Sequence, residues 1–177
     1  MAATQEDIEQ LFITLYDTYQ NAIFRHCYFR VYHREIAKEL AQEAFMKVWD
    51  YMQKGNTLEH PKTFLYTIAT NTIIDYRRRK KEQSLDQLQD AGFQIADEEH
   101  IEKTVDEHIA MKHLRDVLDT LEDIYHEAFV LRYIEGLKPK EIAEITGETV
   151  NVISVRINRA KRQVQQKLKK DTLDKTI

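Results

Sequence analysis

The sequence of 177 residues has few of the residues that make turns or cross-links, with four glycines, two prolines and one cysteine. A many-stranded sandwich or barrel needs a turn about every 8–12 residues, so this composition argues against such folds. The single Cys27 excludes a disulfide framework and a cysteine-rich zinc module, and it suits a reducing compartment. We therefore expect a protein built from helices.

Long apolar segments are also missing. The longest charge-free stretch, residues 63–74, has 12 residues, of which four are threonines, whereas a spanning helix needs roughly 20 apolar residues. The first seven residues are acidic and lack the basic start and apolar core of a signal peptide. The sequence thus predicts a cytoplasmic protein without membrane insertion.

Charge is abundant but unevenly distributed. The chain is 42% apolar, enough for a core, and carries a formal net charge of −4. Residues 77–81 are five consecutive bases, residues 82–107 hold nine acids and one base, and residues 149–170 hold seven bases and no acid. One basic run is usually a solvated helix end. Two runs that flank an acidic segment indicate two nucleic-acid-facing modules joined by a solvated tether.

The acidic segment also predicts the domain boundary. It is sparse in apolar residues, and Ala91-Gly92 interrupts any helix there, so it cannot bury enough surface to offset its ordering entropy. We predict an all-α protein with two small helical domains, residues 6–81 and residues 105–170, joined by an acidic flexible linker over residues 82–104.

Apolar spacing of three and four residues predicts three helices in the N-terminal domain. The first begins near Ile8. The second runs from about Glu35 to Met52, and Gly55 terminates it. The third runs from about Phe64 into the arginines at residues 77–79. Three such helices suffice for a small bundle.

Large aromatic residues gather near one end of the second and third predicted helices. They are Phe45, Trp49, Tyr51, Phe64 and Tyr66. Packing in the core is the usual fate of each one. As a group beside a basic run, they also suit a platform on which exposed bases stack.

The C-terminal domain has the pattern of a helix-turn-helix. An apolar line at Ile124, Ala128, Leu131 and Ile134 predicts a helix that ends at Gly136. Further along, Pro139 suits a first helical turn, Gly147 suits a turn that needs positive φ, and Thr149 suits a helix N-cap. These residues delimit two helices joined by a short turn.

The second helix of this pair has the features of a recognition helix. Val152, Arg156 and Arg159 fall on one line that we expect to be exposed. The line that we expect to be buried consists of Ile153, Ile157, Ala160, Val164 and Leu168. In a helix lying in the major groove, the N-terminal residues reach the base edges. Arg156 either forks onto a guanine or contacts phosphates only, and Val152 or Val155 suits a thymine methyl group.

Three segments carry a resemblance to a known family. They are residues 39–49, which open with Glu39-Leu40-Ala41-Gln42-Glu43-Ala44-Phe45, residues 64–78, which end in Asp75-Tyr76-Arg77-Arg78, and residues 131–160, which hold the helix-turn-helix. In this order and spacing, the chain resembles the group IV (extracytoplasmic function) sigma factors of bacterial RNA polymerase. It departs from the usual family residues at Phe64, Glu122, Val152 and Val155.

The resemblance implies a non-enzymatic protein that binds core RNA polymerase and directs promoter-specific transcription initiation. It implies recognition of the −35 duplex and of the melted −10 element, contact with the clamp helices and the flap of the polymerase, and regulation by an anti-sigma factor. The residues implied for core polymerase binding are Glu39, Leu40, Gln42, Glu43, Phe45 and Trp49. Those implied for the −10 element are Lys54, Asn56, His60, Lys62, Phe64, Asn71, Arg77, Arg78 and Arg79. Those implied for the −35 element are Lys138, Lys140, Asn151, Val152, Ser154, Val155, Arg156 and Arg159.

Two other classes of protein share part of this pattern. A two-component or quorum-type regulator has a similar helix-turn-helix, but it would need an α/β receiver or a ligand-binding sheet, and the N-terminal half shows no period-two strand pattern. An enzyme would need a site, yet His26 and His33, and likewise His108 and His113, lack the spacing of a helical zinc pair. We therefore expect neither a metal nor a cofactor.

Overall fold

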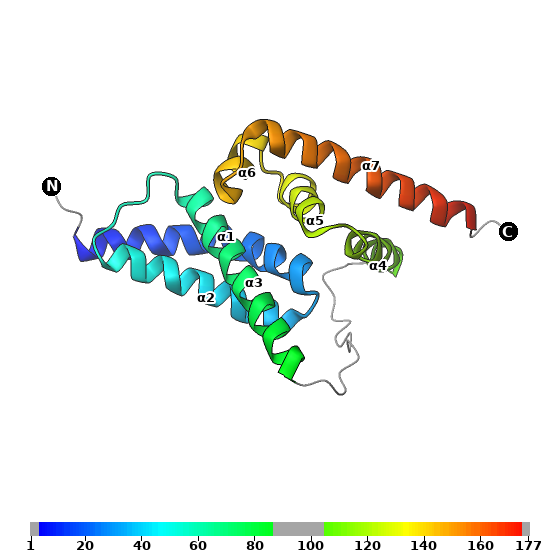
Figure 1. Cartoon of the computed structure of the whole chain (residues 1–177). Coiled ribbons are helices and arrows are strands. Elements are labelled where there is room, and N and C mark those ends of the chain that lie inside the picture. The colour runs from blue at the N-terminus through cyan, green and yellow to red at the C-terminus, as the bar shows by residue number, and fades with distance from the viewer. Residues whose placement is uncertain (1–3, 87–104, 175–177) are drawn as a thin grey trace. The chain divides into compact units, whose positions relative to one another are not determined.

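The computed structural model describes residues 4–86 and 105–174, which are helical apart from short connections (Figure 1). The chain divides into two compact units, residues 1–97 and residues 98–177. The prediction of an all-α protein with two helical domains is confirmed, while residues 87–104 of the predicted linker lie outside the described residues. The elements are α1 (Gln5–Val31), α2 (Arg34–Gln53), α3 (Pro61–Asp86), α4 (Val105–Asp119), α5 (Asp123–Phe129), the π-helix η1 (Val130–Ile134), α6 (Pro139–Thr146) and α7 (Val150–Asp174).

Local hydrogen bonds set the ends of α1 and the start of α2. The Thr4 N–H donates to Asp7 Oδ2 at 2.9 Å, and the Asp7 N–H donates to Thr4 Oγ1 at 3.2 Å. The bonds from the Thr4 hydroxyl and N–H lower the pKa of Asp7. The helix ends at Tyr32, whose φ of 49° is left-handed, and the His33 ring then accepts from the Ile36 N–H at 3.4 Å. This tight connection makes α1 and α2 an antiparallel pair.

The core of the N-terminal unit lies between α1, α2 and α3, which all pack on one another. Figure 1 shows α1 and α2 side by side, with α3 crossing them. The His26 Nε2 of α1 lies 3.1 Å from the Thr70 Oγ1 of α3, which joins these helices inside the core. The main apolar side chains of this core are Leu15, Ile23, Phe29, Leu40, Ala44, Val48, Met52, Leu65, Ala69 and Ile73.

The third helix is longer than the sequence predicts at both ends. It begins at Pro61, where proline suits the first turn, and it continues past Lys81 to Asp86. Residues 82–86, predicted to open the flexible linker, are therefore helical. Its core contacts end near Ile73, and Arg77, Arg78 and Arg79 are exposed. The basic run is therefore an extension of a core helix.

The C-terminal unit is organised around α7, which packs on α4, α5 and α6. The predicted buried line of α7 is confirmed at Ile153, Ile157, Ala160 and Val164, whereas Leu168 is half-buried. Ile124 differs, because α5 begins at Asp123 and Ile124 therefore lies in its first turn, where it is 40% exposed. The other main core side chains are Leu118, Val130, Leu131, Leu137 and Ile142.

A π-turn that the periodicity did not predict follows α5. The Glu135 N–H donates to Val130 O at 3.0 Å, a bond across five residues, and the Leu137 N–H donates to Leu131 O at 2.9 Å. The Arg132 Nη1 then donates to Leu137 O at 3.0 Å. The helix thus ends just before Gly136 in a wider turn than an α-helix would give.

The helix-turn-helix forms as the sequence predicts. Pro139 lies in the first turn of α6, Gly147 has φ +72°, and the Val152 N–H donates to Thr149 Oγ1 at 3.3 Å. The Glu148 N–H donates to Ala143 O at 3.1 Å, which closes the end of α6. Within the described residues, no helix has the length and hydropathy that a membrane crossing requires.

Candidate nucleic-acid interface

The predicted −35 residues all lie on α6, on α7 or next to the start of α6. Asn151, Val155 and Arg159 are exposed, whereas Val152 and Ser154 are half-buried. The Ser154 hydroxyl donates to Val150 O at 2.8 Å, so this hydroxyl bonds within its own helix. Lys138 and Lys140 are exposed at the start of α6. The set therefore shares one helix-turn-helix, with three exposed side chains on the first three turns of α7.

Arg156 differs from the expectation of a fully exposed side chain. Its Nη2 lies 2.6 Å from Glu148 Oε1, and only 20% of its side chain is exposed. Sequence reasoning missed Glu148 because this residue stands in the turn before α7, and only residues within the predicted helix were compared for spacing. The available signal in the sequence was a single acid directly before a helix whose charged residues are all bases up to Lys170.

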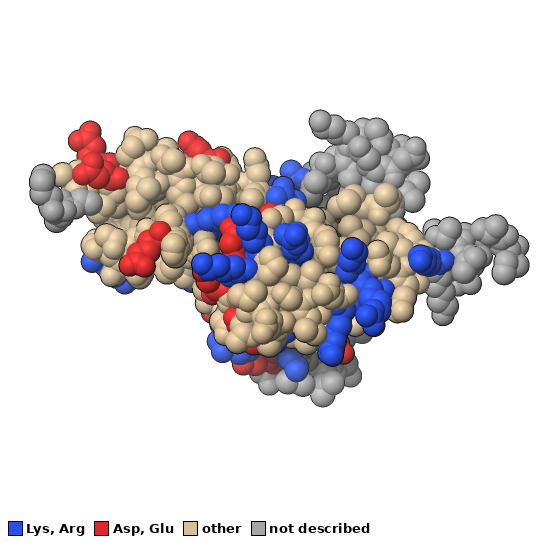
Figure 2. Space-filling view, turned by 90° about the horizontal axis from the view of Figure 1, so that it is seen from above, with Lys and Arg blue, Asp and Glu red and all other residues tan. Residues whose placement is uncertain are grey.

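Two further bases of α7 have partners on other elements. The Arg159 Nη1 donates to Tyr125 Oη of α5 at 3.3 Å. The Lys167 Nζ donates to Thr120 O at 3.2 Å and also to Thr120 Oγ1, just after α4. Figure 2 shows Lys and Arg side chains in several groups over the surface, with acidic side chains among some of them. The basic segments of the sequence are thus surface features that are partly anchored to neighbouring helices.

The predicted −10 residues lie along α3 and in the connection before it. Lys62, Phe64, Asn71 and the three arginines belong to α3, and Asn71 is exposed. At about 1.5 Å per residue, Asn71 lies roughly 15 Å along the helix from Pro61, and Arg77 about 9 Å further. The residues Lys54, Asn56 and His60 precede the helix and are exposed. The set therefore spans a length of helix and is not gathered at one point.

Side-chain bonds connect two members of this set to nearby residues. The Asn56 Nδ2 donates to Tyr51 O at 2.9 Å, which ties the connection to the end of α2. The Arg78 Nη2 lies 3.1 Å from Asp75 Oδ1, an exposed pair on one face of α3. Such an exposed ion pair contributes little to stability, so Arg78 can exchange Asp75 for a phosphate at small cost.

The aromatic group divides between core and surface. Phe45 and Tyr66 are 4% and 2% exposed, so the hypothesis that they form a stacking platform is wrong. They fill the core, which large aromatics usually do. Tyr51 and Phe64 have ring centroids 4.6 Å apart, and Tyr51 is 36% exposed. This pair, beside the connection to α3, keeps aromatic surface accessible.

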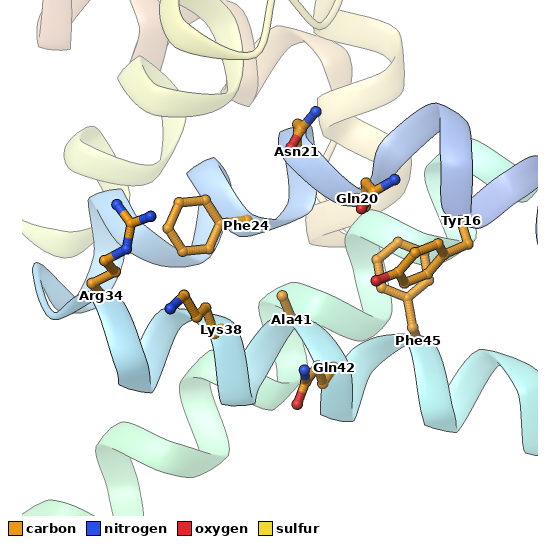
Figure 3. A pocket seen from close by; sticks show the side chains of 9 residues that line it. All are labelled: Tyr16, Gln20, Asn21, Phe24, Arg34, Lys38, Ala41, Gln42 and Phe45. Atoms are coloured by element: carbon orange, nitrogen blue, oxygen red, sulfur yellow. The ribbon is translucent and has the colours of Figure 1, made fainter. Parts of the chain in front are cut away.

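The face of α2 predicted to bind polymerase has polar residues outside and apolar residues inside. Glu39 and Gln42 are exposed, Glu43 and Trp49 are half-buried, and Leu40 and Phe45 are buried. A groove of about 330 Å³ runs between α1 and α2 on this side (Figure 3). Its lining consists of Tyr16, Gln20, Asn21, Phe24, Arg34, Lys38, Ala41, Gln42 and Phe45.

Polar contacts connect this face of α2 to α3. The Lys47 Nζ donates to Thr72 Oγ1 at 3.0 Å and pairs with Glu43 Oε1 at 2.8 Å. Burial, and secondarily the charge of Glu39, raises the pKa of Tyr76 on α3. The predicted polymerase-binding helix and the predicted −10 helix therefore share side-chain contacts within one unit. Among the described residues, no three His, Cys, Asp or Glu side chains are grouped to hold a metal.

The sequence matches two family models, one in each unit. Sigma-70 region 2 matches residues 15–83, and Sigma-70, region 4 matches residues 112–164. The region 2 match covers the three-helix core and the arginine run, and the region 4 match covers the helix-turn-helix. This combination defines the protein as a transcription initiation factor of the sigma-70 type.

Whole-chain comparisons narrow the class. RNA polymerase sigma factor YlaC of Bacillus subtilis is 29% identical over 98% of both chains. The ECF RNA polymerase sigma factor SigW of the same organism is 28% identical over 91% of this chain and 90% of its own. The sigma factor RpoE from Bartonella quintana, solved with the anti-sigma factor NepR, has the same fold, with a TM-score of 0.75 at 21% identity over 93% of this chain and 98% of that one.

The chain belongs to the extracytoplasmic function (ECF) sigma factors. It directs promoter-specific initiation of transcription and is not an enzyme. The family and function predicted from the sequence are thereby confirmed.

Proposed function

We propose that this sigma factor divides promoter recognition between its two units. The N-terminal unit binds core RNA polymerase through α2 and holds the melted −10 strand along α3. The C-terminal unit reads the −35 duplex with α7. The observation that carries this proposal is that each unit has a core helix with exposed bases. They are Arg77, Arg78 and Arg79 on α3 and Arg159, Lys161 and Arg162 on α7.

The geometry of α7 supports duplex reading. The first turns of a recognition helix meet base edges in the major groove, and here they present Asn151, Val155 and Arg159 to solvent. Val155 offers an apolar surface to a thymine methyl group. The exposed Lys138 and Lys140 suit phosphate contacts, which fix register without reading sequence.

The geometry of α3 supports binding of a separated strand. An unstacked base costs a few kcal/mol to extrude, and stacking on an aromatic ring returns about 1–3 kcal/mol. The accessible Tyr51–Phe64 pair offers such a ring, and the exposed amide of Asn71 offers donors and an acceptor for a base edge. Arg77 and Arg79 would contact the flanking phosphates.

The face of α2 supports binding to the polymerase. We propose that Glu39, Gln42 and Glu43 contact the clamp helices of the largest polymerase subunit and that Trp49 lies at the edge of this contact. Leu40 and Phe45 are buried and would support this face from within. The C-terminal unit would contact the polymerase flap.

Regulation and location complete the proposal. RpoE from Bartonella quintana is solved with the anti-sigma factor NepR, and CnrH is solved with the cytosolic domain of CnrY. We propose that this chain is likewise held by an anti-sigma factor and acts in the cytoplasm.

The test measures both binding of the chain to core polymerase and the promoter sequences that the complex selects. The purified chain is mixed with bacterial core polymerase, and the complex transcribes a promoter library randomised at the −35 and −10 elements. We expect a stable complex and enrichment at both elements. Arg159→Ala should reduce enrichment at −35 only, and Asn71→Ala at −10 only. Failure to associate, or enrichment at neither element, would contradict the proposal.

A further inference from the structure

Glu148 is an acidic residue that lies two residues before the start of the basic helix α7. It stands between Gly147 and Thr149, and residues 149–170 hold seven bases and no acid. Its Oε1 contacts the Arg156 Nη2 at 2.6 Å, with 37% of the Glu148 side chain and 20% of the Arg156 side chain exposed. A partly buried, short contact of this kind is a charge-assisted hydrogen bond, stronger than a neutral one.

If α7 lies on DNA, the negative charge of the Glu148 carboxylate lowers the affinity for DNA. Phosphate-driven affinity rises with each base and falls with each acid near the backbone. A favourable interaction with the N-terminal end of α7 accounts for an acid at this position, but it does not account for a bond to a side chain two turns along the helix. The bond to Arg156 therefore has a separate explanation.

We propose that Glu148 is a positioning residue that holds the Arg156 guanidinium for reading a base pair in the −35 duplex. This inference rests on the proposed function of α7. A free arginine samples many rotamers and readily contacts a phosphate. An arginine that is bonded to Glu148 has lost this rotamer freedom before DNA binds, so the loss of side-chain conformational entropy on binding is smaller.

The chemistry of the pair permits both contacts together. A guanidinium has five N–H donors, so an arginine bonded to a carboxylate through Nη2 retains donors for guanine O6 and N7. The Glu148 carboxylate also disfavours an approach of phosphate to Arg156, which leaves a base edge as the favoured acceptor. Glu148 thus lowers affinity for DNA in general and raises discrimination at one position.

The experiment uses the full chain with core polymerase and a duplex library randomised across the −35 element. It compares wild type with Arg156→Ala, Glu148→Ala and Glu148→Gln, and with Glu144→Gln as a matched control. Glu144 is an exposed acid on α6, so its substitution makes the same change in charge. Binding to a random-sequence duplex is measured in parallel, and circular dichroism verifies folding of each variant.

We expect Arg156→Ala to reduce discrimination at one position by about 5- to 150-fold, the range for a bidentate contact. Glu148→Ala should reduce discrimination at that same position by at least about fivefold and strengthen binding to random duplex. Glu148→Gln, which keeps an acceptor oxygen, should fall between Glu148→Ala and wild type in discrimination. Glu144→Gln should leave the preference profile unchanged.

Three results would overturn the inference. Unchanged discrimination in Glu148→Ala would remove the positioning role and leave the proposed function of α7 intact. An equal loss of binding to every duplex would assign Glu148 a structural role only. A wild-type complex without any −35 preference would overturn the proposed function of α7 and this inference with it.

Discussion

Replacing Gly147 by alanine tests the geometry of the helix-turn-helix. The residue has φ +72°, and a Cβ built there meets no atom within 4 Å, so the strain is confined to the backbone. A left-handed conformation costs an L-residue about 1–2 kcal/mol, and the stiffer unfolded chain returns about 0.4–1 kcal/mol. We expect Gly147→Ala to lower the free energy of unfolding of the C-terminal unit by about 1 kcal/mol.

Gly55 gives a matched control in the other unit. Its φ is +80°, its surroundings are equally open, and it follows the end of α2. Trp49 is the only tryptophan of the chain and lies in α2, so its fluorescence in urea reports the N-terminal unit, whereas circular dichroism reports both units. Gly147→Ala should shift the circular dichroism transition alone, and Gly55→Ala should shift the fluorescence transition as well.

Two results would refute this reasoning. A loss several times larger than expected in Gly147→Ala would mean that the added methyl group meets atoms and that the turn is packed. A fluorescence transition displaced by Gly147→Ala would mean that the two units unfold as one.

The remaining predictions concern the two DNA-facing helices and the uncomplexed chain. Asn71→Ala should slow open-complex formation, measured by permanganate reactivity of the melted strand, while duplex binding by the holoenzyme stays intact; equal loss in both assays would indicate misfolding. Tyr125→Phe removes the acceptor for Arg159 and should lower the free energy of unfolding of the C-terminal unit in a urea titration, by at most about 0.5–1.5 kcal/mol, the amount that one hydrogen bond contributes to stability. Glu39→Gln should lower the pKa of Tyr76 towards its ordinary value, since the carboxylate charge contributes to raising it; an unchanged Tyr76 titration by NMR would assign the shift to burial alone. The chain without polymerase, with a net charge of −4, should bind DNA weakly and lose that binding steeply as salt rises; tight, salt-resistant binding would contradict this.

The sequence predicted those parts of the fold that depend on short-range chemistry. Gly147 and Thr149 fixed the turn of the helix-turn-helix because positive φ and N-capping are properties of one residue and its near neighbours. The buried line of α7 followed from spacing alone. The end of α3 was not predicted, because a helix continues through charged residues when its first turns are held by a core.

The features that sequence reasoning missed depend on contacts between elements. Phe45 and Tyr66 could not be separated from Tyr51 and Phe64 by composition, since burial depends on which helix covers each ring. The bond between Glu148 and Arg156 joins the turn before α7 to the helix, and a pattern counted within the helix does not include it. The predicted sets of DNA-binding and polymerase-binding residues remain predictions; they lie on α2, α3, α6 and α7 and in the connections next to them.

The unbroken course of α3, from its buried turns into the basic run, has a consequence for how this helix tolerates change. Successive residues of an α-helix are rotated by about 100° around its axis. The packing of Ile73 in the core therefore sets the direction in which Arg77 and its neighbours point. One residue inserted between them would swing the guanidinium groups a quarter-turn or more away, whereas four would return them to nearly the same azimuth one turn further along. A change in the length of this helix therefore preserves the direction of the guanidinium groups only when it is close to a whole number of turns.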